Sequence, residues 1–133
     1  MSTTKKHFPV FLVAVLLLCC TACSKSITQT GKASYYADSF DGKRTASGQV
    51  FRQNRLTAAH PSLPFGTKLK VTNVANGRTV TVHVNDRGPF AKGRIVDLSK
   101  KAAKQLGMVS TGVATVQIKY KKPKKGVQTV ASH

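Results

Sequence analysis

The sequence lacks glutamate altogether, and its only carboxylate side chains are those of Asp38, Asp41, Asp86 and Asp97. Any acid–base chemistry by a carboxylate must therefore come from one of these positions. Against 4 acidic residues stand 22 lysines and arginines, which give a formal net charge of +18. A chain this basic favours polyanionic partners: nucleic acid, an anionic membrane surface or an acidic wall polymer. Charge alone does not choose among them.

The N-terminal residues have the order of a secretory signal peptide. Two lysines precede an almost wholly apolar run over residues 8–20, which is too short to span a bilayer comfortably, and small residues follow it. The stretch 20–23 (CTAC) resembles a bacterial lipobox, in which the last cysteine is lipidated. We therefore predict a lipoprotein signal peptide over residues 1–22 and lipidation, typically with palmitate, at Cys23. An ordinary signal peptide and an uncleaved membrane anchor remain alternatives.

Cysteine is scarce, and all 3 cysteines lie between Cys19 and Cys23. A mature chain that begins at Cys23 keeps only the lipidated one, which excludes an internal disulfide, a thiolate metal site and a cysteine nucleophile. We expect a fold stabilised by its core alone, with no metal and no cofactor. Because the signal predicts export, and Ser24 suits outer-membrane sorting, we expect the protein in the cell envelope, anchored to the outer membrane and facing the periplasm. No nucleic-acid partner is expected there.

Polar and charged stretches flank the part of the chain that is able to fold. Residues 23–30 are polar and are expected to form a tether. Residues 122–133 continue a lysine cluster interrupted by Pro123, and we expect this basic tail to be disordered. A single domain over residues 31–121 remains, without internal repeats, and we expect it to be a monomer.

Alternation of apolar and polar residues predicts a mainly β domain. Strands are expected over residues 33–36, 68–74, 79–84 and 113–120. An Asn-Gly dipeptide, typical of tight hairpins, joins the middle pair. One helix is predicted over residues 99–106, with Ser99 or Asp97 as its N-cap and Gly107 at its end. Short strands, many turns and little helix favour a small closed barrel, because closure removes exposed strand edges.

Three segments resemble those of a known family: residues 45–51 (TASGQVF), 56–67 (LTAAHPSLPFGT) and 84–98 (VNDRGPFAKGRIVDL). Together they resemble the RlpA family of lytic transglycosylases over about residues 31–121. The resemblance implies a six-stranded double-psi β-barrel with one or two short helices. It also implies a lyase that cleaves MurNAc–GlcNAc glycan strands of peptidoglycan endolytically, preferring strands without stem peptides and leaving 1,6-anhydroMurNAc products.

The scarcity of carboxylates suits this chemistry. Hydrolytic glycosidases ordinarily use two carboxylates. A lytic transglycosylase uses no water, because the muramic 6-hydroxyl attacks its own anomeric carbon, and one carboxyl is then able to act first as general acid and later as base. To work as an acid near neutral pH, that carboxyl needs a raised pKa, which partial burial in apolar surroundings provides.

Asp86 is the strongest candidate for this carboxyl, because it directly follows an alternating valine strand at the point where the chain turns. A turn-forming role, or pairing with Arg87 or Arg94, is the alternative. His60 stands in the motif TAAH, which matches the family's histidine motif, and we assign it to catalysis as a residue that holds the sugar, orients Asp86 or shares its proton. His83 is expected on the opposite strand face and receives no role.

Tyr36, Gln49, Arg87 and Asp97 are the predicted substrate-binding residues. Tyr36 offers an aromatic face for stacking on a sugar ring. Gln49 is able to hydrogen-bond a sugar hydroxyl. Arg87 and Asp97 belong to the third segment, although for Asp97 a helix cap or a partnership with Arg94 is an equally good interpretation.

Gln49 and Arg52 depart from the family's pattern, in which Glu follows the Ser-Gly pair and another acidic residue often comes three positions later. Gln49 cannot carry a proton, and Arg52 reverses the local charge. Two alternatives to an enzyme therefore stay open. One is a non-catalytic, expansin-like module that binds peptidoglycan. The other, which rests on charge alone, is a secreted binder of nucleic acid or lipid surfaces.

Overall fold

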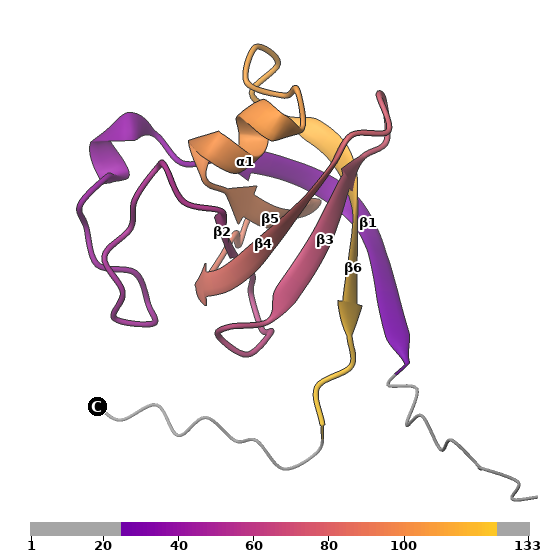
Figure 1. The fold of residues 1–133 in the computed structure, drawn as a ribbon, viewed down its shortest axis with the longest axis horizontal. Helices are drawn as coiled ribbons and strands as arrows, with labels where there is room; N and C mark the ends of the chain where they lie inside the picture. The colour runs from indigo at the N-terminus through magenta and orange to yellow at the C-terminus, as the bar shows by residue number, and fades with distance from the viewer. Residues whose placement is uncertain (1–24, 125–133) are drawn as a thin grey trace, which may run out of the picture.

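Six strands close into a barrel in the computed structural model of the protein, which describes residues 25–124. The strands are β1 (Ser26–Tyr35), β2 (Thr57–Ala59), β3 (Lys68–Asn73), β4 (Thr79–Asp86), β5 (Arg94–Leu98) and β6 (Ala114–Lys121). They follow one another around the barrel in the order β1-β5-β2-β4-β3-β6 (Figure 1). The described residues also contain a 3-10 helix, η1 (Asp38–Phe40), and an α-helix, α1 (Lys100–Gln105). The predicted fold class is therefore confirmed.

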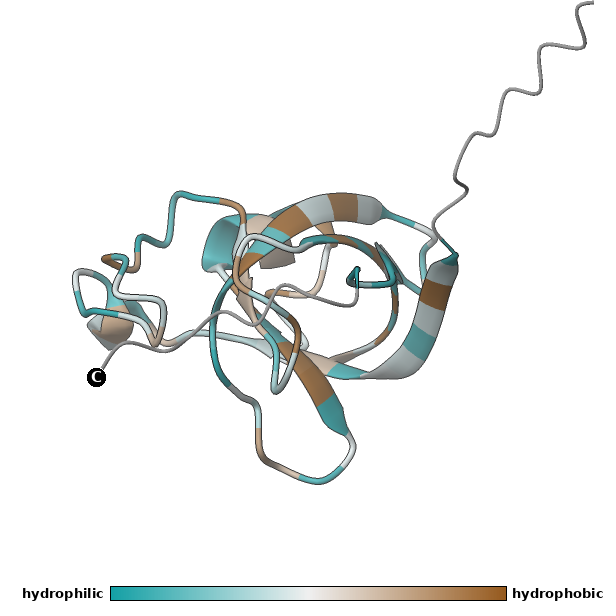
Figure 2. Cartoon of the chain, turned by 90° about the horizontal axis from the view of Figure 1, so that it is seen from below, coloured by the Kyte–Doolittle hydropathy of each residue, from teal (hydrophilic) through white to brown (hydrophobic). Residues whose placement is uncertain are grey.

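Strand alternation builds the core of the barrel. The buried apolar residues of β3, β4, β5 and β6 are Leu69, Val71, Val80, Val82, Val84, Val96, Leu98, Val116 and Ile118. The polar residues between them on β3 and β4 are mostly exposed, and apolar and polar bands alternate along the strands in Figure 2. β3 and β4 form the predicted hairpin, in which Gly77 adopts the positive φ of +72° that favours glycine in such a turn.

Two parallel strand pairs distinguish this barrel from a simple meander. β1 runs parallel to β5 and β2 runs parallel to β4, and each pairing contains one register shift. Parallel neighbours need crossover connections, so the segments that join these strands cannot be tight hairpins. β2 and β5 were absent from the sequence prediction because such short strands show too little alternation to be recognised.

The helix α1 lies across one end of the barrel (Figure 1). Ser99, rather than Asp97, is its N-cap, because Ser99 Oγ accepts a hydrogen bond from Ala102 N at 3.3 Å. Ala102 and Ala103 are buried on the face towards the barrel. Gly107 has a φ of +67°, which confirms the predicted end of the helix.

The strand β1 begins earlier than predicted. Residues 26–30, expected to belong to the tether, form its first half and pair antiparallel with β6, with Ser26 opposite Lys121. The expectation was wrong because these residues are polar and largely exposed, so no alternation marks them as a strand. Backbone hydrogen bonds to a distant partner, which a local pattern does not report, hold them in the barrel.

Three predictions fall on residues that the structure does not describe: the signal peptide over residues 1–22, the lipidation site Cys23, and the tail beyond Lys124. Between residues 25 and 124, none of the helical segments has the length and apolar character needed to cross a membrane.

Candidate active site

Asp86 is the last residue of β4, where the barrel wall passes into the following turn, and it is only 8% exposed. Three donors reach its carboxylate. Tyr36 Oη lies 2.5 Å from Oδ2, while the backbone nitrogens of Ala46 and Arg87 lie 2.8 Å and 2.9 Å from Oδ1. These donors come from the end of β1, from the loop over residues 45–51 and from the turn itself. Asp86 is thus held rigidly where three distant segments meet.

Among residues 25–124, Asp86 differs from the other carboxylates in having no cationic side chain as a partner. Each of the others forms an ion pair: Asp38 with Lys100 at 2.9 Å, Asp41 with Arg52 at 3.5 Å, and Asp97 with Arg94 at 2.8 Å. Within residues 25–124 these are the only ion pairs, so the alternative of an Asp86 pairing with Arg87 or Arg94 is not what the structure shows. The same residues contain no group of three or more His, Cys, Asp or Glu side chains that could hold a metal ion.

The hydroxyl of Tyr36, rather than its ring face, contacts the site. The ring packs against Phe40 and Phe51, with centroid separations of 4.9 Å and 4.4 Å. Burial, followed by the hydrogen bond to Asp86, raises the pKa of Tyr36 well above its usual range, so the hydroxyl stays protonated and donates to Asp86. Tyr36 therefore positions the carboxylate, which differs from the sugar-stacking contact predicted from the sequence.

The imidazole of His60 forms hydrogen bonds with the backbone of the turn that follows it. Its Nδ1 accepts hydrogen bonds from the backbone N–H groups of Ser62 and Leu63, both at 3.1 Å. The proton of the neutral ring is then on Nε2, which is buried and finds no partner in the described part of the chain. Burial, together with the charge of Arg87, lowers the pKa of His60 and keeps the ring neutral at pH 7.

The contact between His60 and Asp86 runs through the backbone. The N–H of His60 donates to the carbonyl oxygen of Asp86 at 3.1 Å, as part of the junction between β2 and β4. The predicted motif thus does lie beside the predicted acid. A catalytic role for the His60 side chain stays a prediction, because the hydrogen bonds of its Nδ1 are structural.

The side chain of Arg87, in the segment over residues 84–98, forms hydrogen bonds with the backbone of the segment over residues 56–67. Its Nη1 donates to the carbonyl oxygens of Leu63 at 2.8 Å and His60 at 3.4 Å. Its guanidinium carbon lies 4.0 Å from the centroid of the Phe65 ring, a close cation–π contact. Arg87 reaches Asp86 only through its backbone N–H, and substrate binding by its side chain stays a prediction.

Asp97, on β5, is bound by neighbouring strand residues. Both carboxylate oxygens accept hydrogen bonds from Arg94 Nη2 at 2.8 Å, and Ser34 Oγ donates to Oδ1 at 2.7 Å. Of the two structural interpretations, the pairing with Arg94 is confirmed and the helix cap is wrong. The negative charge of Asp97 helps to raise the pKa of Tyr36, so Asp97 acts on the site electrostatically. A direct contact with substrate stays a prediction.

The turn over residues 45–49 contacts Asp86 through a backbone N–H group and contributes no acidic side chain. The carbonyl oxygen of Gln49 accepts hydrogen bonds from Thr45 N at 2.8 Å and Thr45 Oγ1 at 3.1 Å, which leaves Ala46 N–H free to bind Asp86. The residue Gln49 is exposed on this turn. Arg52 is also exposed, and Asp41 partly neutralises its charge. The segment over residues 45–51 therefore lies beside the candidate site, and Gln49 is exposed on that segment.

Phe90 was missed by the sequence interpretation, although it belongs to the most specific motif. It is 84% exposed, the largest exposure among the large apolar residues described, and it stands four residues beyond Asp86. An exposed aromatic ring offers a flat apolar face that is able to pack against a ligand. The signal in the sequence was the placement of an aromatic residue after Gly-Pro, within a turn where it has no strand face to bury it.

The closed six-stranded barrel with two parallel strand pairs places this domain in the double-psi β-barrel class. The family model described as "Lytic transglycolase" matches residues 28–118. The chain belongs to this family, which confirms the resemblance carried by the three motifs.

Two relatives show how far the similarity extends. A probable endolytic peptidoglycan transglycosylase RlpA of Synechocystis sp. is 56% identical over 88 residues, covering 66% of this chain and 27% of that protein. The endolytic peptidoglycan transglycosylase RlpA of Campylobacter jejuni is 55% identical over 91 residues, covering 68% and 33%. The chain thus spans about a third of the length of these relatives or less.

Among solved structures, the apo form of an expansin from Clavibacter michiganensis is similar to the barrel. It superposes with a TM-score of 0.59 and 25% sequence identity, over 75% of this chain and 53% of that one.

Proposed function

We propose that this domain is an endolytic peptidoglycan lytic transglycosylase, a carbon–oxygen lyase that cleaves between MurNAc and GlcNAc and leaves 1,6-anhydroMurNAc ends. The observation that carries the proposal is Asp86, a buried carboxylate fixed by three donors and free of any ion pair in the described residues. The names of the relatives support the reaction class. Strands that lack stem peptides are the proposed substrates, as in the family that the motifs resemble.

The proposed reaction needs one carboxyl and no water. Protonated Asp86 gives its proton to the glycosidic oxygen while the bond from that oxygen to C1 of MurNAc breaks. The Asp86 carboxylate then takes the proton of the MurNAc 6-hydroxyl as its oxygen bonds to C1, which closes the anhydro ring and restores the acid. Tyr36 Oη and the backbone N–H groups of Ala46 and Arg87 stabilise the carboxylate formed between these steps.

The structure favours this single-carboxyl route over hydrolysis. A hydrolase needs a second carboxylate facing the scissile bond, to activate water or to act as nucleophile. Asp97 is the other acid near the site, and its two oxygens are bound to Arg94 and Ser34. No further carboxylate is supplied by the 45–51 loop, where Gln49 stands.

The test is a product assay on the purified protein. Sacculi and glycan strands freed of stem peptides are incubated with wild type, Asp86→Asn and Gln49→Glu, and mass spectrometry detects 1,6-anhydromuramyl products. Asp41→Asn is the matched control, because it removes a carboxylate that is exposed and paired with Arg52. We expect products from wild type and Asp41→Asn but not from Asp86→Asn. Their absence from wild type, where a related enzyme yields them, refutes the proposal.

A non-catalytic module that binds peptidoglycan is the second candidate, and the exposed Gln49 motivates it. If the reaction requires a carboxylate at this position, the barrel binds glycan without cutting it. This candidate predicts that Asp86→Asn leaves binding to sacculi intact and that wild type releases no product. Products from Gln49→Glu alone would identify a domain that has lost its activity through this one residue.

We further propose that the protein is lipid-anchored through Cys23 in the cell envelope, at the outer membrane facing the periplasm. The apolar run over residues 8–20 and the following CTAC stretch support this. Metabolic labelling with palmitate tests it: wild type should incorporate label and Cys23→Ser should not. Equal labelling of both would place the lipid elsewhere.

A further inference from the structure

The two described ends of the chain leave the barrel side by side. Ser26 at the start of β1 lies opposite Lys121 at the end of β6, and Lys122 N donates to Lys25 O at 3.0 Å. In Figure 1 these ends of β1 and β6 lie at the lower end of the barrel, opposite the end that α1 covers. An attachment through the N-terminal segment therefore holds this end of the barrel close to the attached surface.

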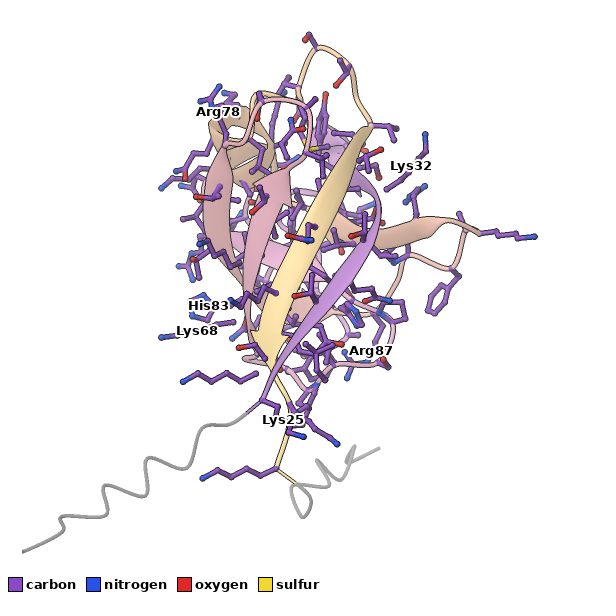
Figure 3. The ribbon with its side chains drawn as sticks, turned by 90° about the vertical axis from the view of Figure 1, so that its right-hand side faces the viewer. Lys25, Lys32, Lys68, Arg78, His83 and Arg87 are labelled. Carbon is purple, nitrogen blue, oxygen red and sulfur yellow. The ribbon has the colours of Figure 1, made fainter. Side chains whose placement is uncertain are left out.

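A basic groove lies on the barrel wall beside these ends. It has a volume of about 580 Å³, and its cationic lining residues are Lys68 and Lys70 of β3 and Lys119 and Lys121 of β6, which we call the lysine groove. All four are exposed. Lys25, Lys122 and Lys124 are exposed next to it along the chain, and Figure 3 shows Lys25 and Lys68 in the same lower part of the barrel.

In the part of the chain that the structure describes, no acidic side chain pairs with the lysine groove. The strands β3 and β6 contain no acidic residue, and all of the chain's aspartates lie elsewhere, in ion pairs with other residues or at the candidate active site. Lys70 and Lys119 are even direct cross-strand partners. Like charges placed opposite each other destabilise a sheet, so this pair weakens the fold unless an external anion lies between its members.

We propose that the lysine groove, with Lys25, Lys122 and Lys124, is a docking surface for the anionic headgroups of the membrane that holds the N-terminus. Only two residues lie between Cys23 and Ser26, and the three Cα–Cα steps that join them span about 10 Å when fully extended. An anchor at Cys23, or an apolar segment retained at residues 8–20, therefore brings this end of the barrel to the lipid surface. Lysines beside a membrane attachment point add electrostatic attraction to anionic headgroups.

This inference rests on the membrane attachment proposed above and not on the glycan chemistry, so the product assay and the following experiment can fail independently. The full chain is bound to neutral phosphatidylcholine vesicles or to vesicles that also contain phosphatidylglycerol. Brief acetylation of lysines is then measured by mass spectrometry. We expect labelling of the lysine groove to fall about five-fold on the anionic vesicles and to recover at high salt, because salt screens exposed charges.

Lys92, Lys101 and Lys104 are the internal controls, because they are exposed but belong to the β4–β5 loop and to α1. Their labelling should be the same on both kinds of vesicle. Equal labelling of the lysine groove on both, equal protection of groove and control lysines, or no binding to the anionic vesicles would each overturn the inference. Protection by sacculi but not by anionic vesicles would also overturn it, in favour of a wall polymer as the partner.

A charge-reversal variant provides a second test that does not depend on labelling. Lys70→Glu converts the like-charge pair with Lys119 into an opposite-charge pair, so the thermal midpoint should rise. The same variant should reduce the preference for anionic over neutral vesicles by about ten-fold, whereas Lys101→Glu should reduce it little. A variant that is more stable and equally selective would show that the pair has no role in membrane docking.

Discussion

At the scale of single residues, the site depends on how Asp86 is held. A carboxylate buried without partners would be costly, and an ion pair would bind the group that exchanges a proton in the proposed reaction. Tyr36 Oη and two backbone N–H groups avoid both problems, because they fix the oxygens without adding a cationic side chain. The aromatic packing of Tyr36 on Phe40 and Phe51 in turn fixes the hydroxyl.

Tyr36→Phe is predicted to lower product formation by roughly 10- to 100-fold, because one donor to the carboxylate is lost while the ring remains. The fold should lose only about 1 kcal/mol. Rates of anhydromuramyl release and thermal unfolding measure the two effects. Tyr35→Phe is the control, since that hydroxyl donates to the carbonyl oxygen of Val109 instead. Equal rates in the two variants would mean that Tyr36 does not position Asp86.

His60 is predicted to make the fold sensitive to mild acid. Because burial holds the pKa of His60 below 6.5 in the folded state, the unfolded state binds the proton more readily. The stabilisation is therefore complete above about pH 6.5 and is lost as the pH falls towards the lowered folded pKa. The free energy of unfolding should be smaller at about pH 5.5 than at about pH 7.5.

The variant His60→Ala separates this effect from other titrations. It should cost about 2 kcal/mol at neutral pH, because the N–H groups of Ser62 and Leu63 lose their acceptor, and it should flatten the pH dependence. His83→Ala is the control, since His83 lies on the exposed face of β4. Chemical denaturation at both pH values provides the measurement. If the free energy of unfolding of His60→Ala changes with pH as much as that of wild type, another group causes the acid sensitivity.

Phe90→Ala is predicted to weaken binding to glycan strands by about ten-fold while leaving stability within roughly 0.5 kcal/mol of wild type, because the ring is almost fully exposed. The apolar face of a sugar ring packs well on such an aromatic surface. Sedimentation with sacculi measures the binding. Val74→Ala is the control, as Val74 is also an exposed apolar residue but lies at the β3–β4 turn. Unchanged binding in Phe90→Ala would remove this residue from the site.

At the scale of elements, the parallel pairing of β1 with β5 helps to place Tyr36 beside the end of β4. Glycine at position 31 lets the two strands approach closely, because a Cβ there would lie 2.6 Å from Ile95 Cγ2. Residues 26–30 then continue β1 along β6, which explains why a stretch without apolar alternation is part of the barrel. The strand β5, which the sequence did not predict, is thus the parallel neighbour of the half of β1 that leads to Tyr36.

Gly31→Ala is predicted to destabilise the barrel by about 1–3 kcal/mol, because the new methyl group overlaps Ile95. Ile95→Ala should relieve the clash, so the double variant Gly31→Ala/Ile95→Ala should lose less than the sum of the single losses. Chemical denaturation of the four proteins measures this coupling. Additive losses would show that the close approach does not constrain the pairing of β1 with β5.

At the scale of the whole molecule, the distribution of charge is as informative as its sum. The few carboxylates lie at the site or in ion pairs around η1, β5 and α1, while the lysine groove carries only positive charge. A net charge of +18 also repels itself and weakens the compact state.

The thermal midpoint is therefore predicted to rise by a few degrees when the ionic strength increases from about 0.01 M to about 1 M, as the Debye length falls from about 30 Å to about 3 Å. The rise should be smaller in Lys70→Glu, which already carries less repulsion. Thermal unfolding monitored by circular dichroism is sufficient. A midpoint that falls with sodium chloride would mean that ion pairs outweigh repulsion in this fold.

Local properties of the chain were predictable from the sequence alone. Alternating valines, the Asn-Gly turn and the cap and end of α1 depend on neighbouring residues, so their patterns are visible without a structure. The scarcity of carboxylates and the NDRGPF motif made Asp86 the candidate acid for the same reason. Family membership followed from these local motifs together.

The tertiary structure alone decided which distant groups meet. Tyr36 and Asp86 are 50 residues apart, and the parallel pairings of β1 with β5 and of β2 with β4 bring the hydroxyl to the carboxylate. The same packing ties His60 and Arg87 to backbone groups, exposes Phe90, and aligns Lys70 with Lys119 on neighbouring strands. A sequence pattern reports the preferences of neighbouring residues, whereas these contacts depend on strand register and burial, which exist only once the barrel has closed.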